Sequence, residues 1–279
     1  MTDDREETTL AIELKLLREG KTKKIWRYPL STYEVLIESK DDVTAGDGAK
    51  RIQVKGKGAY STETTANCFE FLRRNYIPNH FVKKENELTF RALELHMIPI
   101  EVVTRRVATG SYLKRNPDVK EGAYFTPPMI EFFDKDDAMH DPLLIYDLVS
   151  SRILRYDAKL PISRGFIDEL PLESRAESGF LIKELTNIGE QVFLALEKAW
   201  ATLNVTLCDL KVECGRGVVA GGIMLGDAIT NDEWRLWPDG DKSRELSKQV
   251  FRDMTEVTPE KLIELEANYA LVAEMTRKF

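Results

Sequence analysis

The sequence predicts an α+β fold, because strand-like and helix-like patterns occupy different parts of the chain. Short segments rich in branched and aromatic residues come first, the longest helical patterns come late, and no regular strand–helix alternation joins them. The 279 residues are enough for one large domain or two smaller ones with a sizeable core. We expect a β-rich N-terminal lobe over residues 1–95 and an α+β lobe over residues 96–279.

The first elements are predicted to be an antiparallel meander of short strands. These strands lie at residues 13–17, 24–28 and 34–39. Gly20 and Pro29 separate them, as expected for turns. Residues 41–58 follow, with four glycines among charged residues, and are predicted to form a long functional loop.

Helical periodicity begins at Ser61, where apolar residues recur at three- and four-residue spacing until Pro78. Further strands are predicted at residues 88–95, 98–107, 206–214 and 223–225. The longest helix carries an apolar stripe from Leu181 to Leu203. Another helix begins at Thr258 and Pro259, which form a typical start signal.

One stretch, residues 145–178, contains Pro161, Gly165 and Pro171 and shows no strong periodicity. We therefore expect a surface insertion there.

Composition excludes several classes of protein. The chain has 40 Lys+Arg and 47 Asp+Glu, a formal net charge of −7, which argues against nucleic-acid and membrane-surface partners. No segment reaches the roughly 18 apolar residues of a membrane helix, and the first residues lack the apolar core of a signal peptide. The three cysteines and three histidines are too scattered for a disulfide framework or a zinc site. We expect a cytoplasmic protein.

A glycine turn followed by lysines is the first candidate for binding chemistry. Gly20 would let a phosphate approach the backbone, while Lys21 and Lys23 on one strand face supply positive charge. This is not a P-loop, because Lys15 stands where that motif needs glycine and a strand rather than a helix follows. The alternative is a tight hairpin with solvated lysines.

The strand at residues 206–214 alternates strictly, so Asp209, Lys211 and Glu213 share one face. An apolar return segment ends at Asp227. If the hairpin centre lies near Ala220, Glu213 and Asp227 face each other with Cβ atoms about 4.5–5.5 Å apart. A divalent cation such as Mg²⁺ between them would relieve their repulsion. A solvated charged face is the alternative.

Two arginines suggest a pocket for a second anion. Arg105 leads from an apolar strand to Gly110 and Ser111, a composition suited to phosphate, and Arg235 lies between two tryptophans. A basic surface loop and simple cation–π stacking are the alternatives. Together the candidates suggest a magnesium nucleotide facing a second phosphorylated or carboxylated substrate.

Several blocks together resemble the SAICAR synthetase family. They lie at residues 16–23, 39–47, 97–103, 105–117, 135–142, 209–213 and 232–238. The likeness covers most of the chain, and residues 145–178 depart from the usual pattern. It implies an α+β fold with a kinase-like first half and an ATP-grasp-like second half. It also implies a homo-oligomer.

The resemblance implies an ATP-dependent ligase of purine biosynthesis. Such an enzyme joins L-aspartate to carboxyaminoimidazole ribonucleotide (CAIR) through an acyl phosphate, and it gives the succinocarboxamide SAICAR, ADP and phosphate. Its expected cofactor is Mg²⁺, and its expected partners are the small molecules ATP, CAIR and L-aspartate. A small-molecule kinase and a nucleotide-sensing module remain alternatives.

The resemblance also assigns roles to individual residues of this sequence. Residues expected at ATP are Gly20, Lys21, Lys23 and Met97; those expected at Mg²⁺ are Glu213 and Asp227. Residues expected at the ribonucleotide 5′-phosphate are Arg105, Ser111 and Arg235, with Asp209 near the ribose. Lys211 would neutralise the transferring phosphoryl group. Lys135 and Asp141 fall in another block expected near substrate.

Overall fold

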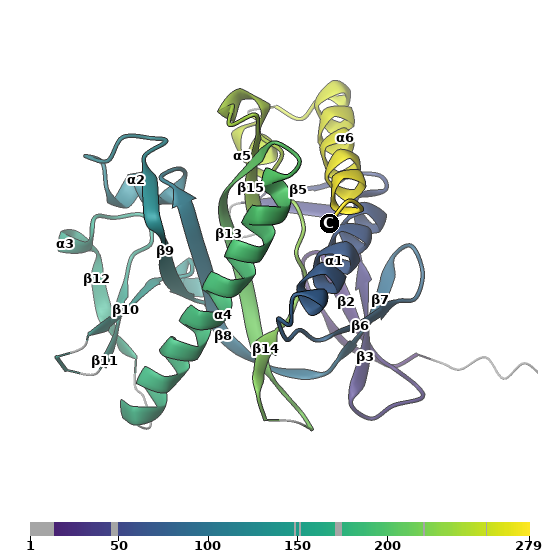
Figure 1. The fold of residues 1–279 in the computed structure, drawn as a ribbon, viewed down its shortest axis with the longest axis horizontal. Coiled ribbons are helices and arrows are strands. Elements are labelled where there is room, and N and C mark those ends of the chain that lie inside the picture. Colours follow the sequence, from purple (N-terminus) through teal and green to yellow (C-terminus); the bar gives the residue numbers. More distant parts are fainter. Residues whose placement is uncertain are drawn as a thin grey trace, which may run out of the picture.

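The larger of two main antiparallel sheets lies at the left and centre of Figure 1 and the smaller at the right, with long helices beside them. The computed structural model describes residues 14–45, 50–147, 149–150, 152–170, 175–219, 221–254 and 256–279. Antiparallel strands and separate helices confirm the α+β prediction. Within these ranges, no helix combines the length and the apolar character needed to span a bilayer.

The smaller sheet has five strands in the order β1-β2-β3-β7-β6. Their bounds are Leu16–Glu19 (β1), Lys23–Arg27 (β2), Glu34–Ser39 (β3), Phe81–Lys84 (β6) and Thr89–Leu93 (β7). In β3, Val35, Ile37 and Ser39 are buried and alternate with more exposed residues, so one face of this sheet packs against the core. The predicted meander is confirmed, except that residue 13 lies outside the described ranges.

A second hairpin corrects the prediction of one continuous loop over residues 41–58. Strands β4 (Asp42–Ala45) and β5 (Lys50–Gln53) pair with each other. Val43 and Val54 pack in a small core with Tyr269, which anchors β4 and the end of β5. The glycines of this segment indicate a loop, and strands of only four residues are too short to stand out against that signal.

Helix α1 (Lys57–Arg74) begins four residues before the predicted Ser61. Its first backbone N–H groups have a partner that the periodicity did not reveal. The Asp41 carboxylate accepts hydrogen bonds from the backbone N–H groups of Gly56 (3.3 Å) and Gly58 (2.8 Å). This carboxylate satisfies donors that every helix start leaves open.

The larger sheet has seven strands in the order β12-β11-β10-β9-β8-β13-β14, and an eighth strand, β15, also pairs with β13. Their bounds are Leu95–Val107 (β8), Tyr124–Asp134 (β9), Leu143–Asp147 (β10), Arg152–Tyr156 (β11), Phe166–Leu170 (β12), Val205–Gly217 (β13), Ile223–Leu225 (β14) and Trp234–Pro238 (β15). The change from one sheet to the other falls between Leu93 and Leu95, although one core cluster continues through both sheets. The division into lobes at residue 95 stays a prediction.

Residues 145–178, expected to be a surface insertion, contain regular strands that the sequence did not predict. Strands β10, β11 and β12 extend the larger sheet at one edge, at the left of Figure 1, and a single turn of helix, α3 (Ile162–Gly165), connects the last two. Each strand has five residues, too few for periodicity alone to reveal.

Helix α4 (Arg175–Ala201) crosses one face of the larger sheet (Figure 1). Gly189 permits this contact, because a Cβ there would lie 2.7 Å from Cγ1 of Val102. The predicted apolar stripe is confirmed by the burial of Leu185, Val192 and Leu196. Because α4 covers Val102 and Thr104, the odd-numbered residues of β8 face the other side.

Among the remaining helices, α6 packs against α1, and the others are short. Their bounds are Ser111–Arg115 (α2), Gln249–Asp253 (α5) and Pro259–Thr276 (α6), with 3-10 turns at Asp137–Met139 (η1) and Lys242–Arg244 (η2). The α6 start is confirmed: the Thr258 hydroxyl accepts a hydrogen bond from the Lys261 backbone N–H at 3.4 Å.

Candidate active site

Two adjacent strands place most candidate residues on the sheet face opposite α4. In the antiparallel register of β8 and β13, Asp209 faces Arg105 and Glu213 faces Glu101, with Lys211 between them opposite Val103. The predicted alternation is therefore confirmed for Asp209, Lys211 and Glu213, which share one charged face. It does not hold over all of residues 206–214, because the register shifts between Leu207 and Asp209 and again after Glu213. Neighbouring charged groups on such a face act on one another directly.

At one end of this face the predicted anion-binding residues come together. The Arg105 guanidinium donates from Nη1 to Oδ2 of Asp209 at 2.8 Å and from Nη2 to Oγ of Ser111 at 3.5 Å. Arg235, on β15 directly opposite Asp209, donates to the same Asp209 oxygen. We call Arg105, Ser111, Arg235 and Asp209 the arginine clamp.

Gly110 makes room for the clamp. Its φ of +60° favours glycine, and a Cβ there would lie 2.4 Å from Nη2 of Arg235. Burial would lower the pKa of Arg235, but Asp209 and Glu245 outweigh this effect and raise it. Arg235 therefore remains charged in a buried position, as binding a phosphate requires.

Beside the clamp lies a cluster of lysines and carboxylates. Lys211 Nζ donates to Glu101 Oε1 at 2.8 Å and to Glu213 Oε1 at 3.2 Å. Lys135 donates to the other oxygen of Glu213. Lys23, from the smaller sheet, donates to Oδ1 of Asp227 at 2.5 Å. We call these six residues the lysine–carboxylate cluster.

The cluster keeps its charges despite burial. Burial would raise the pKa of Asp227, but Lys23, Lys135 and Lys211 together lower it below its ordinary value. Burial would likewise lower the pKa of Lys211, but Glu101 and Glu213 hold it well above its ordinary value. A concentrated set of opposite charges can exchange partners with an incoming anion or cation.

The predicted direct pairing of Glu213 with Asp227 is wrong by one residue. Cys214 pairs with Leu225, and the Gly226 backbone N–H donates to the Glu213 carbonyl at 2.9 Å, so Gly226 stands opposite Glu213. Asp227 follows with a φ of +54°. The glycines of the connecting loop permit more than one loop length, so the sequence does not fix this register. Ala220, the expected centre, lies outside the described residues.

The two carboxylates nevertheless act in one electrostatic environment. The charges of both Asp227 and Glu213 contribute to the raised pKa of Lys23, and Lys135 acts on both carboxylates. Within the described ranges, no three His, Cys, Asp or Glu side chains are placed to hold a metal ion among themselves.

The residues predicted at ATP lie where the two sheets meet. The turn at Gly20 is closed by a hydrogen bond from its N–H to the Lys23 carbonyl at 2.8 Å. Met97, opposite Gly215 on β13, is 40% exposed, and its Sδ would lie 3.2 Å from a Cβ at Gly226. Lys23 and Met97 thus converge near Asp227.

Lys21 takes a different position from Lys23. Its Nζ donates to both carboxylate oxygens of Asp137 at 2.9 Å, so it contacts η1 rather than the cluster. Asp141 follows η1 with a φ of +51°, and its backbone N–H donates to the Asp136 carbonyl at 3.0 Å. Lys135 precedes η1 in the same loop, and its side chain donates to Glu213.

Sequence reasoning missed several side chains that hold the site together. Glu101 contacts Lys211, Glu131 contacts Arg105, and Asp137 contacts Lys21. Glu101 could have been found, because it shares the period-two face of Arg105 and is the one acidic residue of β8. Glu131 lies on β9, and its contact with Arg105 depends on the pairing register of β8 with β9, which neither strand encodes alone.

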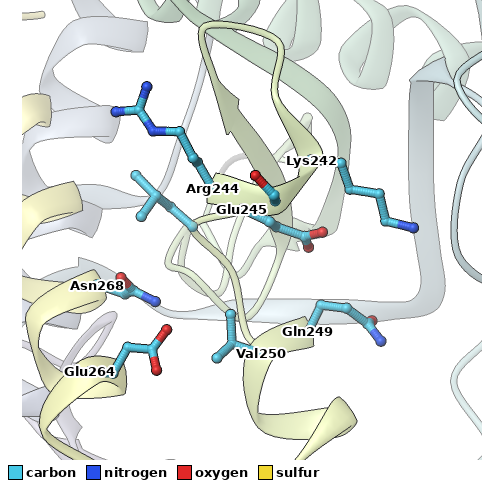
Figure 2. A pocket seen from close by; sticks show the side chains of 9 residues that line it. Lys242, Arg244, Glu245, Gln249, Val250, Glu264 and Asn268 are labelled. Atoms are coloured by element: carbon cyan, nitrogen blue, oxygen red, sulfur yellow. The ribbon is translucent and has the colours of Figure 1, made fainter. Parts of the chain in front are cut away.

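A cavity of about 230 Å³ lies elsewhere, between η2, α5 and α6 (Figure 2). Glu245, Gln249 and Glu264 are among the residues that line it. None of the predicted site residues lines this cavity. One of its lining residues is close to the clamp: Glu245 Oε1 lies 3.9 Å from Nε of Arg235.

Two arginines around Asp209 beside a lysine–carboxylate cluster, in an α+β fold, are typical of enzymes that act on phosphorylated substrates. The chain belongs to the SAICAR synthetase family, whose sequence model matches residues 16–266.

Individual relatives agree with this family. A phosphoribosylaminoimidazole-succinocarboxamide synthase of Roseiflexus sp. (strain RS-1) is 43% identical over 93% of this chain and 95% of its own length. The multifunctional protein ADE2 of Gallus gallus is 42% identical over 95% of this chain and 59% of its own length. A solved SAICAR synthetase in complex with ADP is 28% identical, with a TM-score of 0.70, over 92% of this chain and 97% of its own.

Proposed function

We propose that this chain is an ATP-dependent ligase that joins L-aspartate to CAIR and gives SAICAR, ADP and phosphate. One observation carries the proposal: the strand residues of the arginine clamp, Arg105 and Asp209, and those of the lysine–carboxylate cluster share one continuous face of β8 and β13. Asp209 and Glu213 are four residues apart along β13, which corresponds to about 13 Å. A ribonucleotide held by its 5′-phosphate at the clamp would extend its base toward the cluster.

The chemistry needs two anions brought together. A carboxylate is a poor acyl donor, so the γ-phosphoryl group of ATP moves to the CAIR carboxylate and forms an acyl phosphate. The amine of L-aspartate then attacks the carbonyl carbon, and phosphate leaves. Bringing these groups together demands positioning and neutralisation of charge more than acid–base chemistry.

The residues of the chain divide these tasks. Arg105, Ser111 and Arg235 hold the 5′-phosphate, and Asp209 fixes both arginines and borders the ribose. Lys211, the central residue of the charged face, stabilises negative charge on the transferring phosphoryl group. Lys135 and Asp141 belong to the loop that reaches the cluster and contact substrate.

The nucleotide site lies at the junction of the sheets. Gly20, Lys21 and Lys23 bind the ATP phosphates, and Met97 borders the adenine. The relative solved with ADP supports nucleotide binding in this fold. On binding, Lys23 would exchange its contact with Asp227 for a phosphate oxygen.

Mg²⁺ fits the carboxylates present. Magnesium is commonly bound by one or two carboxylates together with substrate phosphates, rather than by a cage made of protein alone. In the structure, the carboxylates of Glu213 and Asp227 are neutralised by the ammonium groups of Lys135 and Lys23. These carboxylates thus already interact with positive charge, as they would with Mg²⁺. When bound, Mg²⁺ would neutralise phosphate charge and help orient the γ-phosphoryl group.

A coupled assay tests the function. With ATP, Mg²⁺ and CAIR supplied, ADP release should require L-aspartate, and a product of the mass of SAICAR should accumulate with it. A kinase that stops at phosphoryl transfer would release ADP steadily without aspartate, which would contradict the ligase. A binding module would bind ATP and show no turnover with all three substrates.

From the family likeness we also propose a homo-oligomer and a cytoplasmic location. Light scattering of the purified protein tests the first, and a monomer at micromolar concentration would contradict it.

A further inference from the structure

The guanidinium of Arg105 has a partner that the clamp itself does not explain. Its Nε donates to Oε2 of Glu131 at 2.6 Å, from the strand next to β8. The other oxygen of Glu131 accepts a hydrogen bond from Nη2 of Arg115 at 2.5 Å. Glu131 therefore connects the clamp arginine to a second arginine.

Arg115 is buried beneath the clamp, with its side chain 1% exposed. It ends α2, the short helix that Ser111 begins, and its guanidinium lies over the Phe133 ring at 5.3 Å. Its Nη1 donates to the Ala158 carbonyl at 2.8 Å. Ala158 lies between β11 and α3, at the edge of the larger sheet.

The contacts of Arg105 fix the direction of its fork. Nε is held by Glu131, Nη1 by Asp209, and Nη2 lies near Ser111, so each edge of the planar guanidinium has a partner. Without Glu131, only Asp209 and the longer contact with Ser111 would orient the group, and its Nε edge would have no partner among these residues. Phosphate recognition by a guanidinium depends on this orientation as well as on charge.

We propose that Glu131 and Arg115 are positioning residues for the 5′-phosphate of the ribonucleotide, and that the β10–β12 extension supports substrate binding through the Ala158 carbonyl. This inference rests on the proposed function. It assigns a task to residues 145–178 that their sequence did not reveal. Neither Glu131 nor Arg115 needs to touch substrate to perform it.

The competing explanation is that the network only stabilises the fold. Removing one partner of a buried ion pair commonly destabilises a protein, so loss of stability cannot separate the two explanations. A readout of the phosphate group alone can. The probes are the carboxamide analogue of CAIR, which retains the 5′-phosphate, and the corresponding nucleoside, which lacks it.

Calorimetry with wild type and Glu131→Gln measures the ratio of the two affinities. Wild type should bind the ribonucleotide much more tightly than the nucleoside. In Glu131→Gln that ratio should fall about 10- to 100-fold, as expected for loss of one oriented charge-assisted contact. KM for CAIR should rise by a similar factor, while KM for ATP changes less than about twofold.

Two more variants complete the test. Arg115→Lys keeps the charge but cannot bridge Glu131 and Ala158 with a planar fork, so the ratio should fall by a smaller factor. Arg152→Gln is the control: it removes an exposed ion pair with Glu169 in the same extension, 51% and 43% exposed, and should leave the ratio unchanged.

An unchanged ratio in folded Glu131→Gln would overturn the inference, as would equal increases in KM for CAIR and ATP. If Glu131→Gln does not fold, Glu131→Asp decides by the same ratio. Failure of the proposed function would look different, because wild type itself would then form no SAICAR.

Discussion

Gly110 leaves no space for a side chain in the arginine clamp. Gly110→Ala should displace the Arg235 guanidinium and raise KM for the ribonucleotide about tenfold or more, as loss of a charge-assisted hydrogen bond would. Its KM for ATP should change little. Steady-state kinetics with each substrate varied in turn measures both values.

Gly122→Ala is the matched control for this substitution. Gly122 also has a positive φ, +84°, but a Cβ there would meet no atom within 4 Å. Both variants should lose about 1–3 kcal/mol of folding free energy through backbone strain. If Gly122→Ala raised KM for the ribonucleotide equally, the effect would come from strain rather than from Arg235.

Glu213 and Asp227 are the residues on which the magnesium proposal depends. Glu213→Gln and Asp227→Asn should each lower turnover about 100-fold or more and shift the Mg²⁺ concentration for half-maximal rate upward. The reason is the loss of one negative ligand and of its balance with the lysines. Rates measured across a magnesium titration test this.

Asp239→Asn serves as the control, because Asp239 is exposed and pairs with Arg244 outside the cluster. It should keep the wild-type magnesium profile. Wild-type profiles in Glu213→Gln and Asp227→Asn, with folding verified by circular dichroism, would contradict the metal assignment.

Sequence reasoning could find the charged face but not its complete set of contacts. Strict alternation places Asp209, Lys211 and Glu213 together without knowledge of any other segment. Local composition also points to Arg105 and Arg235 as a pocket for a second anion, and the family resemblance assigns that pocket to the 5′-phosphate. The partners of these residues depend on strand order and register, which are set by packing across the whole sheet, and Glu131 is invisible for that reason.

Among the elements, α4 provides a direct test of the packing between helix and sheet. Leu196 is fully buried, so Leu196→Ala should lower the free energy of unfolding by about 2–5 kcal/mol, through lost burial and a cavity. Leu194, two residues earlier on the same helix, is 40% exposed. Leu194→Ala should cost less than about 1 kcal/mol.

Urea-induced unfolding of both variants measures the difference. Similar losses for Leu194→Ala and Leu196→Ala would mean that α4 does not pack on the sheet through the face that the structure shows.

The long elements were predictable and the short ones were not. The α4 stripe repeats over many turns, and β8 carries a long apolar run, so each pattern has enough residues to be recognised. The β4–β5 hairpin and strands β10–β12 have four or five residues each. Their structure comes from pairing with neighbours, and local composition only indicated turns.

For the molecule as a whole, His80 joins the two sheets. Its backbone N–H donates to the Leu225 carbonyl at 2.9 Å, and its Nε2 lies 3.0 Å from the Asp227 carbonyl oxygen. Burial lowers the pKa of His80 from 6.5 to about 4. The neutral ring is therefore the form that fits the folded protein.

This pKa predicts an acid-dependent loss of stability. Between about pH 6.5 and pH 4 the unfolded chain binds a proton at His80 that the folded protein does not. The free energy of unfolding therefore decreases as the pH is lowered through this range. The loss from this residue approaches about 3 kcal/mol by pH 4. His80→Gln keeps a donor and removes the titration, so its stability should fall less steeply.

Urea unfolding of wild type and His80→Gln across this pH range isolates the residue, because both proteins share every other titrating group. Parallel curves would show that His80 titrates normally in the folded state. The fold class and the family could be recognised from the sequence. The contacts of His80 with Leu225 and Asp227 could not, because they depend on how two distant segments of the chain meet in the folded protein.

Strand β8 has one more consequence for the enzyme. Met97 near its start and Arg105 near its end are eight residues apart, which is about 26 Å along an extended strand. Each inserted or deleted residue between them would alter that span by about 3.3 Å and turn the following side chains to the opposite face. Strand β8 therefore sets the distance between the proposed nucleotide and ribonucleotide sites. The loops can change in length without altering that distance, whereas the length of the strand must match the combined length of the substrates bound along it.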